Sequence, residues 1–343
     1  MSSASTKPMA SIWVFAAGYF ACYVPYTALT KSLSKGIYPG MEQGLAGASL
    51  LPVSTMAAIV VMLLFVFLTG WWRHATPWQL GGLSLPRPTA STLVSGLSTA
   101  VILTTTTLAY TFDGVSIVFM MLLMRGGVLV IAPVVDAITG RKTRWYSWIG
   151  LGLSLAALVV AFAEDGGYEM SLLASVDIAF YLLGYLVRLR LMSRQAKSED
   201  ASATKRYFVE EQLVAAPATL VVLAAVALLG DQGLPGHLRY GFVGIWDSGF
   251  APQVVGIGVL SQFVGIFGTL VFLDKSENTF SVPVNRCSSI LAGLVASFLL
   301  ALLLGVDWPS AHQLIGAGLV VSAILVLSLV PLLSKPAAPA GSG

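Results

Sequence analysis

An arginine lies inside an apolar stretch of the chain that is otherwise typical of a membrane span. The stretch covers residues 279–295 and contains Arg286, directly after Asn285. A second arginine, Arg125, lies in an apolar run in the other half of the chain. A charge in the hydrocarbon core is costly unless it pairs, faces water or meets a substrate. Because a guanidinium group binds two oxygens of a carboxylate or phosphate at once, both arginines are candidate anion-binding residues.

Both arginines are expected near the middle of the membrane. If its span begins near Val115, Arg125 lies roughly 15 Å deep in a core about 30 Å thick. If its span begins near Thr279, Arg286 lies roughly 11 Å deep from the opposite surface. Pro283 frees backbone carbonyls in the preceding turn, which is tolerated where helices line a cavity. The sequence therefore predicts a central site with two cations.

A structural ion pair within the bundle is the alternative interpretation of each arginine, and Asp177 is the obvious partner. Asp177, Tyr181, Gly184 and Arg188 share one helical face because they are spaced by three or four residues. Asp177 and Tyr181 are therefore candidate substrate-binding residues. Arg188 is interpreted as a cytoplasmic anchor at the end of its span.

Three charged residues near helix ends are further candidates for substrate binding. Lys31 ends the first span, where a lysine extending to the membrane surface is an equally good interpretation. Glu210 and Glu211 open the seventh span. Acids in a first turn are favoured by the helix dipole, so a capped helix end is at least as good an interpretation as a binding role.

The composition indicates an integral membrane protein. The 343 residues are 56% hydrophobic and 10% charged, whereas soluble proteins contain about 25% charged residues. No P-loop, G-x-S-x-G, H-E-x-x-H or zinc pattern occurs. A membrane enzyme or lipid-handling scaffold is the other class considered, but an enzyme needs a nucleophile with a base or a set of metal ligands. We therefore expect no enzymatic activity, no cofactor and no bound metal.

Ten apolar segments are each long enough to cross a membrane as a helix. Glycine, proline or charged residues separate them. The expected fold is thus an all-α integral membrane protein with ten transmembrane helices, followed by a disordered tail at 335–343. The expected spans are 11–30, 45–69, 90–111, 115–138, 145–163, 170–191, 207–229, 252–272, 279–304 and 312–333.

The distribution of lysine and arginine predicts the orientation in the membrane. Most of them lie on the side of the N-terminus, and only Lys31, Lys35 and Arg239 lie opposite. Both termini are therefore expected in the cytoplasm, beginning with the tail 1–10. Five spans fall in residues 11–163 and five in 164–334. An odd number of spans makes the two halves inverted repeats, as in many transporters.

The ten-span plan resembles the drug/metabolite transporter superfamily, and most closely its nucleotide-sugar and triose-phosphate transporter branch. Residues 280–286, which end in Asn285-Arg286, resemble the G-A-L-N-K segment of GDP-sugar transporters and the Lys-Arg pair of sugar-phosphate transporters. Phe208-Val209-Glu210-Glu211 is similar in place to their F-Y-N-N segment. Leu29-Thr30-Lys31, followed by Tyr38-Pro39, looks like the Asn-Lys and Phe-Pro of their first helix. The resemblance implies alternating access, often as exchange, and makes Asn285 an anion contact.

The chain departs from that branch at two places. Arg286 stands where lysine is usual, and two glutamates stand where two asparagines contact the nucleotide sugar. The function expected is secondary transport of a small organic anion, nucleotide-linked or phosphorylated. Arg125 and Arg286 would neutralise the anion, Lys31 would attract it, and the two glutamates would contact its polar end.

The alternative function is export of amino acids, amines or drugs, as in the broader superfamily. In that case the arginines would bind a carboxylate or pair internally, and a glutamate would select a cation. The expected partners are a small-molecule substrate and the lipid bilayer, with no nucleic acid. The chain is expected as a monomer or homodimer, in a bacterial inner membrane as first choice and an endomembrane as second.

Overall fold

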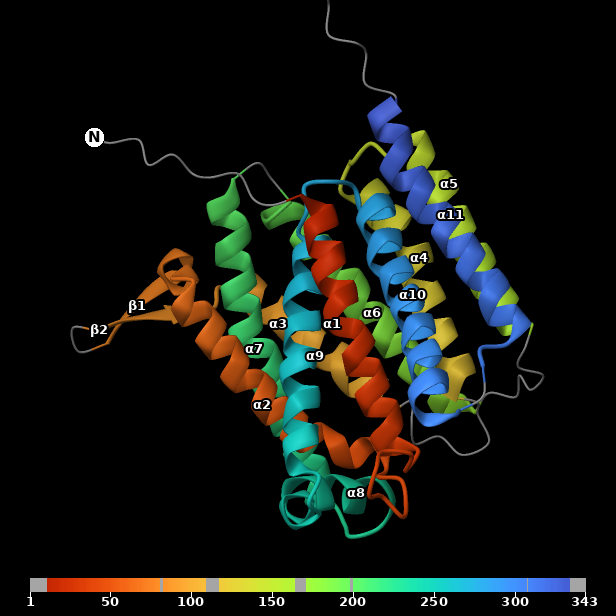
Figure 1. Ribbon diagram of the computed structural model, residues 1–343. Helices are drawn as coiled ribbons and strands as arrows, with labels where there is room; N and C mark the ends of the chain where they lie inside the picture. The colour runs from red at the N-terminus through yellow and green to blue at the C-terminus, as the bar shows by residue number, and fades with distance from the viewer. Residues whose placement is uncertain are drawn as a thin grey trace, which may run out of the picture.

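Long helices that run up and down account for most of the chain (Figure 1). The computed structural model describes residues 11–80, 83–108, 117–163, 171–197, 200–306 and 308–333. The elements in chain order are α1 (Ile12–Ser34), α2 (Gly47–Leu68), η1 (Trp71–His74), β1 (Thr76–Leu80), β2 (Leu83–Arg87), α3 (Ala90–Leu108), α4 (Ile117–Ile138), α5 (Trp145–Phe162), α6 (Leu172–Gln195), α7 (Ala201–Ala227), α8 (Gly233–Phe242), η2 (Gly244–Asp247), α9 (Ala251–Phe272), α10 (Asn278–Leu304) and α11 (Ala311–Leu333).

The bundle has an upper end and a lower end. The upper end is the one at which α1 begins at Ile12 and α10 begins at Asn278 (Figure 1). The lower end carries the short helix α8 (Figure 1). Because consecutive long helices alternate in direction, α4 and α6 both start at the lower end, whereas α7 and α10 start at the upper end.

Helix boundaries follow local capping signals. The side chain of Ser11 accepts a hydrogen bond from the first turn of α1, and Ser171 does the same for α6. Asp200 caps α7 through the backbone N–H of Ser202. The last helical turn of α10 ends at Gly305, whose φ of 66° lies in the left-handed region that glycine adopts without a steric penalty.

Seven helices in the described part of the chain are long and apolar enough to cross a membrane. Shorter apolar helical segments occupy residues 90–106 and 145–160. Large apolar side chains such as Phe67 and Leu303 are exposed on the outer surface, where lipid would cover them. The chain is therefore a multi-pass helical membrane protein, and the number of ten crossings stays a prediction. The seven are α1, α2, α6, α7, α9, α10 and α11.

Two connections contain structure that the hydropathy pattern did not predict. Between α2 and α3 the chain forms an antiparallel hairpin, in which Thr76 of β1 lies opposite Arg87 of β2. Between α7 and α9 it forms α8 and the short helix η2. The helical bundle agrees with the expected all-α class, and the hairpin is an addition to it.

Helices of the two halves contact one another in matching pairs. Helix α1 packs against α9 and α10, and α6 packs against α3 and α4. Likewise α2 packs against α9, and α7 packs against α3. Each of these contacts maps onto another when α1 to α5 are exchanged, in order, with α6, α7, α9, α10 and α11. Helix α8 has no counterpart in the first half of this scheme.

Helix α6 lies close to its neighbours because glycines face them. A Cβ atom at Gly184 would lie 2.9 Å from Cγ1 of Ile102 on α3. A Cβ atom at Gly127 of α4 would lie 2.4 Å from Cδ2 of Leu182 on α6. Small residues of this kind let membrane helices approach closely. They fix the face of α6 that carries the tyrosines of the candidate site.

Candidate functional site

Arg286 is buried within α10. It lies eight residues after the start of the helix, roughly 12 Å from the upper end. Only 7% of the residue is exposed, and its Nε and Nη2 atoms have no hydrogen-bond partner among the described residues. Because a buried donor without an acceptor is unfavourable, this guanidinium is suited to a ligand that supplies oxygen atoms.

Arg125 reaches the same region from the opposite end of the bundle. It lies eight residues after the described start of α4, and its Nη2 atom donates a hydrogen bond to the Tyr23 hydroxyl at 3.3 Å. Tyr19 and Tyr181 each interact electrostatically with both Arg125 and Arg286. The structure thus brings the two sequence-predicted arginines around the same tyrosines of α1 and α6.

Aromatic rings surround the buried guanidinium of Arg286. Its Cζ atom lies 5.0 Å from the ring centroid of Tyr185 and 6.0 Å from that of Phe272. Arg188 lies over the same Phe272 ring at 5.8 Å. Such cation–π contacts stabilise a guanidinium without neutralising its charge. Tyr181 was predicted from the sequence, whereas Tyr185 and Phe272 were not, although Tyr185 follows Tyr181 at a spacing of four residues on the same helical face.

Asn285 lies beside the site against α9. It is buried, and a Cβ atom at Gly268 would lie 3.4 Å from its Nδ2 atom. The same Cβ atom would lie 3.0 Å from Cε2 of Tyr19. A side chain at this position of α9 would therefore crowd the Tyr19 ring, whereas its contact with the Asn285 amide would be an ordinary one. Asn285 and Tyr19 both lie next to Gly268, so the amide of Asn285 is close to the tyrosine that interacts with both arginines.

Neither Arg125 nor Arg286 takes part in an ion pair within the described residues. The pairing of Arg125 with Asp177, considered from the sequence, is not formed. Both carboxylate oxygens of Asp177 are instead buried without a hydrogen-bond partner in this part of the chain. No carboxylate therefore neutralises the central pair of arginines in the described part of the chain. The ion pairs found in the described residues are Arg144–Glu277, Arg188–Glu211 and Arg239–Asp231.

Lys31 lies apart from the two arginines. It is half-buried, and its Nζ atom donates a hydrogen bond to Ser297 Oγ of α10 at 3.2 Å. Lys31 is twelve residues beyond Tyr19 on α1, which corresponds to roughly 18 Å along the helix. It therefore belongs to the lower part of the contact between α1 and α10.

Glu211 is held by an internal ion pair. Its Oε1 accepts from Arg188 Nε at 2.7 Å, and its Oε2 accepts from Arg188 Nη2 at 3.1 Å. Ser95 and Thr99 of α3 donate to the same carboxylate at 2.7 and 3.1 Å. Arg188 also donates to Thr269 Oγ1 of α9 at 3.0 Å. Arg188 is therefore buried rather than a surface anchor, because the carboxylate of the next helix neutralises it.

Glu210 is also saturated by internal contacts. Its Oε1 accepts from the backbone N–H and the hydroxyl of Thr76 at 2.9 and 2.8 Å. Its Oε2 accepts from the Thr89 N–H at 3.1 Å and from the Thr92 hydroxyl at 2.7 Å. This carboxylate attaches both ends of the β1–β2 hairpin to α7. In this structure the two glutamates expected to contact substrate make structural contacts instead.

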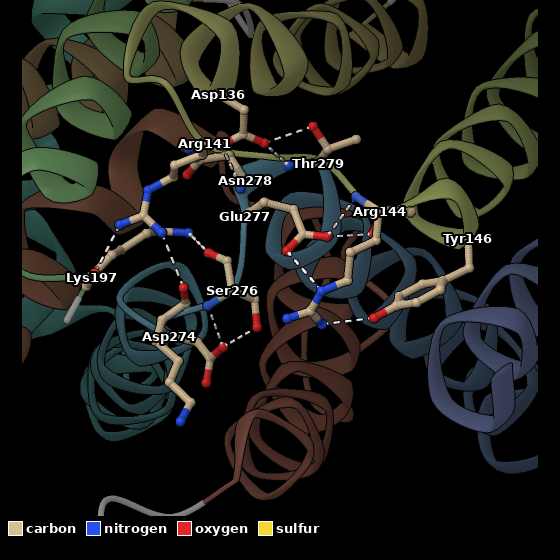
Figure 2. A network of polar contacts seen from close by, with 12 residues as sticks. Asp136, Arg141, Arg144, Tyr146, Lys197, Asp274, Ser276, Glu277, Asn278 and Thr279 are labelled. Carbon is tan, nitrogen blue, oxygen red and sulfur yellow. Dashed lines mark hydrogen bonds and ion pairs between the residues drawn. The ribbon is translucent and has the colours of Figure 1, made fainter. Parts of the chain in front are cut away.

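A polar network joins the helices at the upper end of the bundle (Figure 2). It connects the ends of α4 and α6 and the start of α5 with the turn between α9 and α10. The sequence alone predicted no contacts for these residues. This upper-end network comprises Asp136, Arg141, Arg144, Lys197, Glu277, Asn278 and Thr279.

Asp136 fixes the start of α10 to the end of α4. Its Oδ1 accepts from the backbone N–H and the side-chain Nδ2 of Asn278 at 2.8 and 2.7 Å (Figure 2). Its Oδ2 accepts from the backbone N–H and the hydroxyl of Thr279, both at 2.7 Å. A carboxylate at a helix N-terminus satisfies donors that the helix itself leaves unpaired.

Lys197 and Arg141 bind the turn that precedes α10. Arg141 donates to the backbone oxygens of Lys275 and Lys197 at 3.0 and 2.8 Å. The Nζ atom of Lys197 donates to Ser276 O at 2.9 Å and to Ser281 Oγ at 3.0 Å. Burial lowers the pKa of Lys197 to about 7, because desolvation outweighs the attraction of the nearby acids.

Glu277 joins α5 to the same turn. It accepts from the Ser147 hydroxyl at 2.7 Å and forms an ion pair with Arg144 at 3.8 Å. Arg144 donates to the Tyr146 hydroxyl at 2.7 Å, and this hydrogen bond raises the pKa of Arg144. Together with the contacts of Asp136 and Lys197, these interactions hold the upper ends of α4, α5, α6 and α10 together.

Comparison with known proteins adds information on the fold alone. No family model matches the chain, and no curated protein matches it. A solved structure described only as "Crystal structure of protein" is similar, with a TM-score of 0.55 and 15% sequence identity. The match covers 95% of this chain and 100% of that chain. The two proteins therefore share a fold over nearly their whole lengths.

Proposed function

We propose that the chain is a secondary transporter that carries a small organic anion across a membrane by alternating access. The observation that carries this proposal is the guanidinium of Arg286, buried in the membrane-spanning part of α10 without an ion-pair partner among the described residues. Arg125 supplies the second positive charge. A phosphate or carboxylate group would neutralise both cations and supply the missing acceptors.

The surroundings of the arginines support a polar, oxygen-rich substrate. Tyr23 already hydrogen-bonds Arg125, and Tyr19 and Tyr181 interact with both cations. Phenolic hydroxyls donate and accept hydrogen bonds, so they suit the hydroxyl groups of a sugar as well as an anionic group. Asn285 would add an amide donor. A phosphorylated or nucleotide-linked metabolite fits this chemistry best.

Two features support alternating access. The helices of the first half contact the second half in the same pattern as the helices of the second half contact the first, as expected for inverted repeats. In the proposed cycle the upper-end network, which joins α4, α5, α6 and α10, holds one end of the bundle closed. In the orientation predicted from the lysines and arginines, that end faces the cytoplasm. The residue resemblance to the nucleotide-sugar and triose-phosphate branch, and a bacterial inner membrane location, remain part of this proposal.

Export of amines is supported less well by the contacts. In that function, Glu210 or Glu211 would select the cation. Glu210 accepts four hydrogen bonds from Thr76, Thr89 and Thr92, and Glu211 is paired with Arg188. Neither carboxylate is available to a cation without loss of these contacts.

Uptake into proteoliposomes tests the proposal. The panel comprises inorganic phosphate, glycerol 3-phosphate, a nucleotide sugar, a dicarboxylate and a quaternary amine. We expect uptake of at least one phosphorylated solute, and its loss in the Arg125→Ala, Arg286→Ala double variant. Arg190→Ala is the matched control, because Arg190 is exposed on α6. Full uptake by the double variant, or uptake of the amine alone, would contradict the proposal.

A further inference from the structure

Asp177 is an intramembrane acid that the arginine site leaves unexplained. It lies five residues after the start of α6, roughly 8 Å from the lower end. It is 5% exposed, and neither carboxylate oxygen has a hydrogen-bond partner in the described chain. Burying an ionised carboxylate without a partner costs far more than burying the neutral acid. The geometry therefore favours the neutral acid in this conformation.

The helices packed against α6 offer Asp177 little charge. Helix α3 carries no titratable side chain in its described range. Helix α4 carries Arg125, which contacts Tyr23, and Asp136, which is bound to the start of α10 at the upper end. Arg125 is thus the only charged group in the lower half of these two helices, as far as the structure describes them.

The other charged residues of α6, and those of α7, lie towards the upper end of the bundle. The titratable residues of α7 lie between Lys205 and Glu211, in the part of the helix that starts at the upper end. On α6 the residues beyond Asp177 are the tyrosines and then the arginines. These are Tyr181, Tyr185, Arg188, Arg190 and Arg194.

A proton suits this carboxylate better than a metal cation does. The described residues contain no group of three or more His, Cys, Asp or Glu side chains that could hold a metal ion. Hard cations require several oxygen ligands, whereas a proton needs one. We propose that Asp177 binds a proton that is carried together with the substrate anion. This inference rests on the proposed anion transport and names its coupling ion.

The charges explain why the proton and the anion would move together. When Asp177 is ionised, Arg125 is the only cation in the lower half of the described helices that pack against α6, and the substrate anion requires the same arginine. Occupation of Arg125 by the anion therefore favours the protonated acid. One proton binds to the carboxylate from one side of the membrane and leaves to the other side with the anion. The inferred mode is symport of one proton with each anion.

The tyrosines of α6 connect the acid to the arginines. Asp177, Tyr181 and Tyr185 follow one another at four-residue intervals on one face of the helix. The rings of Tyr181 and Tyr185 lie 5.0 Å apart, and Tyr185 contacts Arg286. Asp177 therefore lies on the face of α6 whose tyrosines surround the two arginines, so a change in its charge alters the electrostatic potential along this face.

Infrared difference spectroscopy of the purified protein tests the proton-binding step without any substrate. Between acidic and alkaline pH, the wild type is expected to lose a carboxylic acid C=O band that Asp177→Asn lacks. Asparagine has the shape of the neutral acid, so this variant is expected to fold. Asp177→Glu is a second variant, which should retain a shifted band. Asp247→Asn, at an exposed position of η2, is the matched control and should leave the band unchanged.

Uptake driven by a proton gradient tests the coupling. The probes are inorganic phosphate and glycerol 3-phosphate, in proteoliposomes whose membrane potential is clamped. One proton per anion predicts about tenfold accumulation for each pH unit of gradient in the wild type, and no accumulation in Asp177→Asn. Identical infrared spectra of wild type and Asp177→Asn, or equal accumulation by both, would overturn the inference. If neither probe is transported, the infrared result still decides whether Asp177 binds the proton, so the two proposals fail separately.

Discussion

At the scale of single residues, Arg188 and Glu211 show how this bundle neutralises a buried charge. The two side chains form two hydrogen bonds with each other, and Ser95, Thr99 and Thr269 complete their coordination. Arg286, nearby over the same Phe272 ring, has no such partner among the described residues. The contrast separates a structural arginine from one that is available to a ligand.

Replacing Glu211 with Gln is expected to destabilise the protein strongly. The guanidinium of Arg188 would remain buried without its carboxylate, which typically costs about 3–5 kcal/mol. Thermal unfolding in detergent measures the effect. The double variant Arg188→Met, Glu211→Leu removes both charges and should recover most of the loss. A double variant no more stable than Glu211→Gln would contradict this account.

The sequence allowed the prediction that Arg125 and Arg286 lie inside the helical bundle, because a charge in an apolar run is visible without a structure. It did not allow the prediction of the partners of Glu210 and Glu211. Glu211 selects Arg188 through the packing of α6 on α7, and Glu210 binds threonines at the two ends of a hairpin. The first choice depends on how two consecutive helices pack, and the second depends on contacts between segments far apart in the chain.

At the scale of elements, the position of Lys197 makes closure of the upper end depend on pH. Its pKa is about 7 when it is buried in the network, against 10.5 when it is exposed. The closed state therefore binds fewer protons than the open state between these values. Raising the pH from about 7 towards 10.5 should stabilise closure. Below about pH 7 the lysine is protonated in both states, and the dependence should disappear.

Labelling of a cysteine at position 196 measures this closure. Ala196 is fully buried at the end of α6, so an Ala196→Cys variant reacts only when the upper end opens. Cys22 and Cys287 are replaced by Ala, and rates are divided by that of a cysteine at exposed Lys142. The normalised rate should fall as the pH rises above 7. Lys197→Met should abolish this dependence, and an unchanged pH profile in that variant would contradict the assignment.

Hydropathy predicted the long helices well because each is a run of apolar residues of sufficient length. The hairpin at Thr76–Arg87 and the helix α8 lack such a run, and their formation depends on contacts with the bundle. Thr76 is held by Glu210, and Gly241 of α8 lies against Ser49 and Pro52 of α2. Short elements of this kind are set by tertiary packing rather than by local composition.

At the scale of the whole molecule, weakening the upper-end network should shift the conformational equilibrium. Asp136→Asn removes the charge that holds the start of α10 through four hydrogen bonds. Each such bond to a charged group is worth about 1.5–3 kcal/mol. The variant is therefore expected to populate a state that is open at this end.

Distances between spin labels measure that shift. Labels at Lys142 and Ala201 report on the upper end, and labels at Gly40 and Trp308 report on the lower end. Asp136→Asn should lengthen the first distance and shorten the second. Glu42→Gln, which removes an exposed acid, should change neither. Unchanged distances in Asp136→Asn would mean that the network does not hold the end closed.

The ring of Phe272 has a consequence for how such chains diverge in evolution. It lies beside both the structural arginine Arg188 and the ligand-binding candidate Arg286. Loss of the ring would remove a cation–π contact, worth about 0.5–2 kcal/mol, from each of them. Homologous chains are therefore expected to change Phe272 in concert with the two arginines, so covariation at these three positions would mark the lineages in which the substrate has changed.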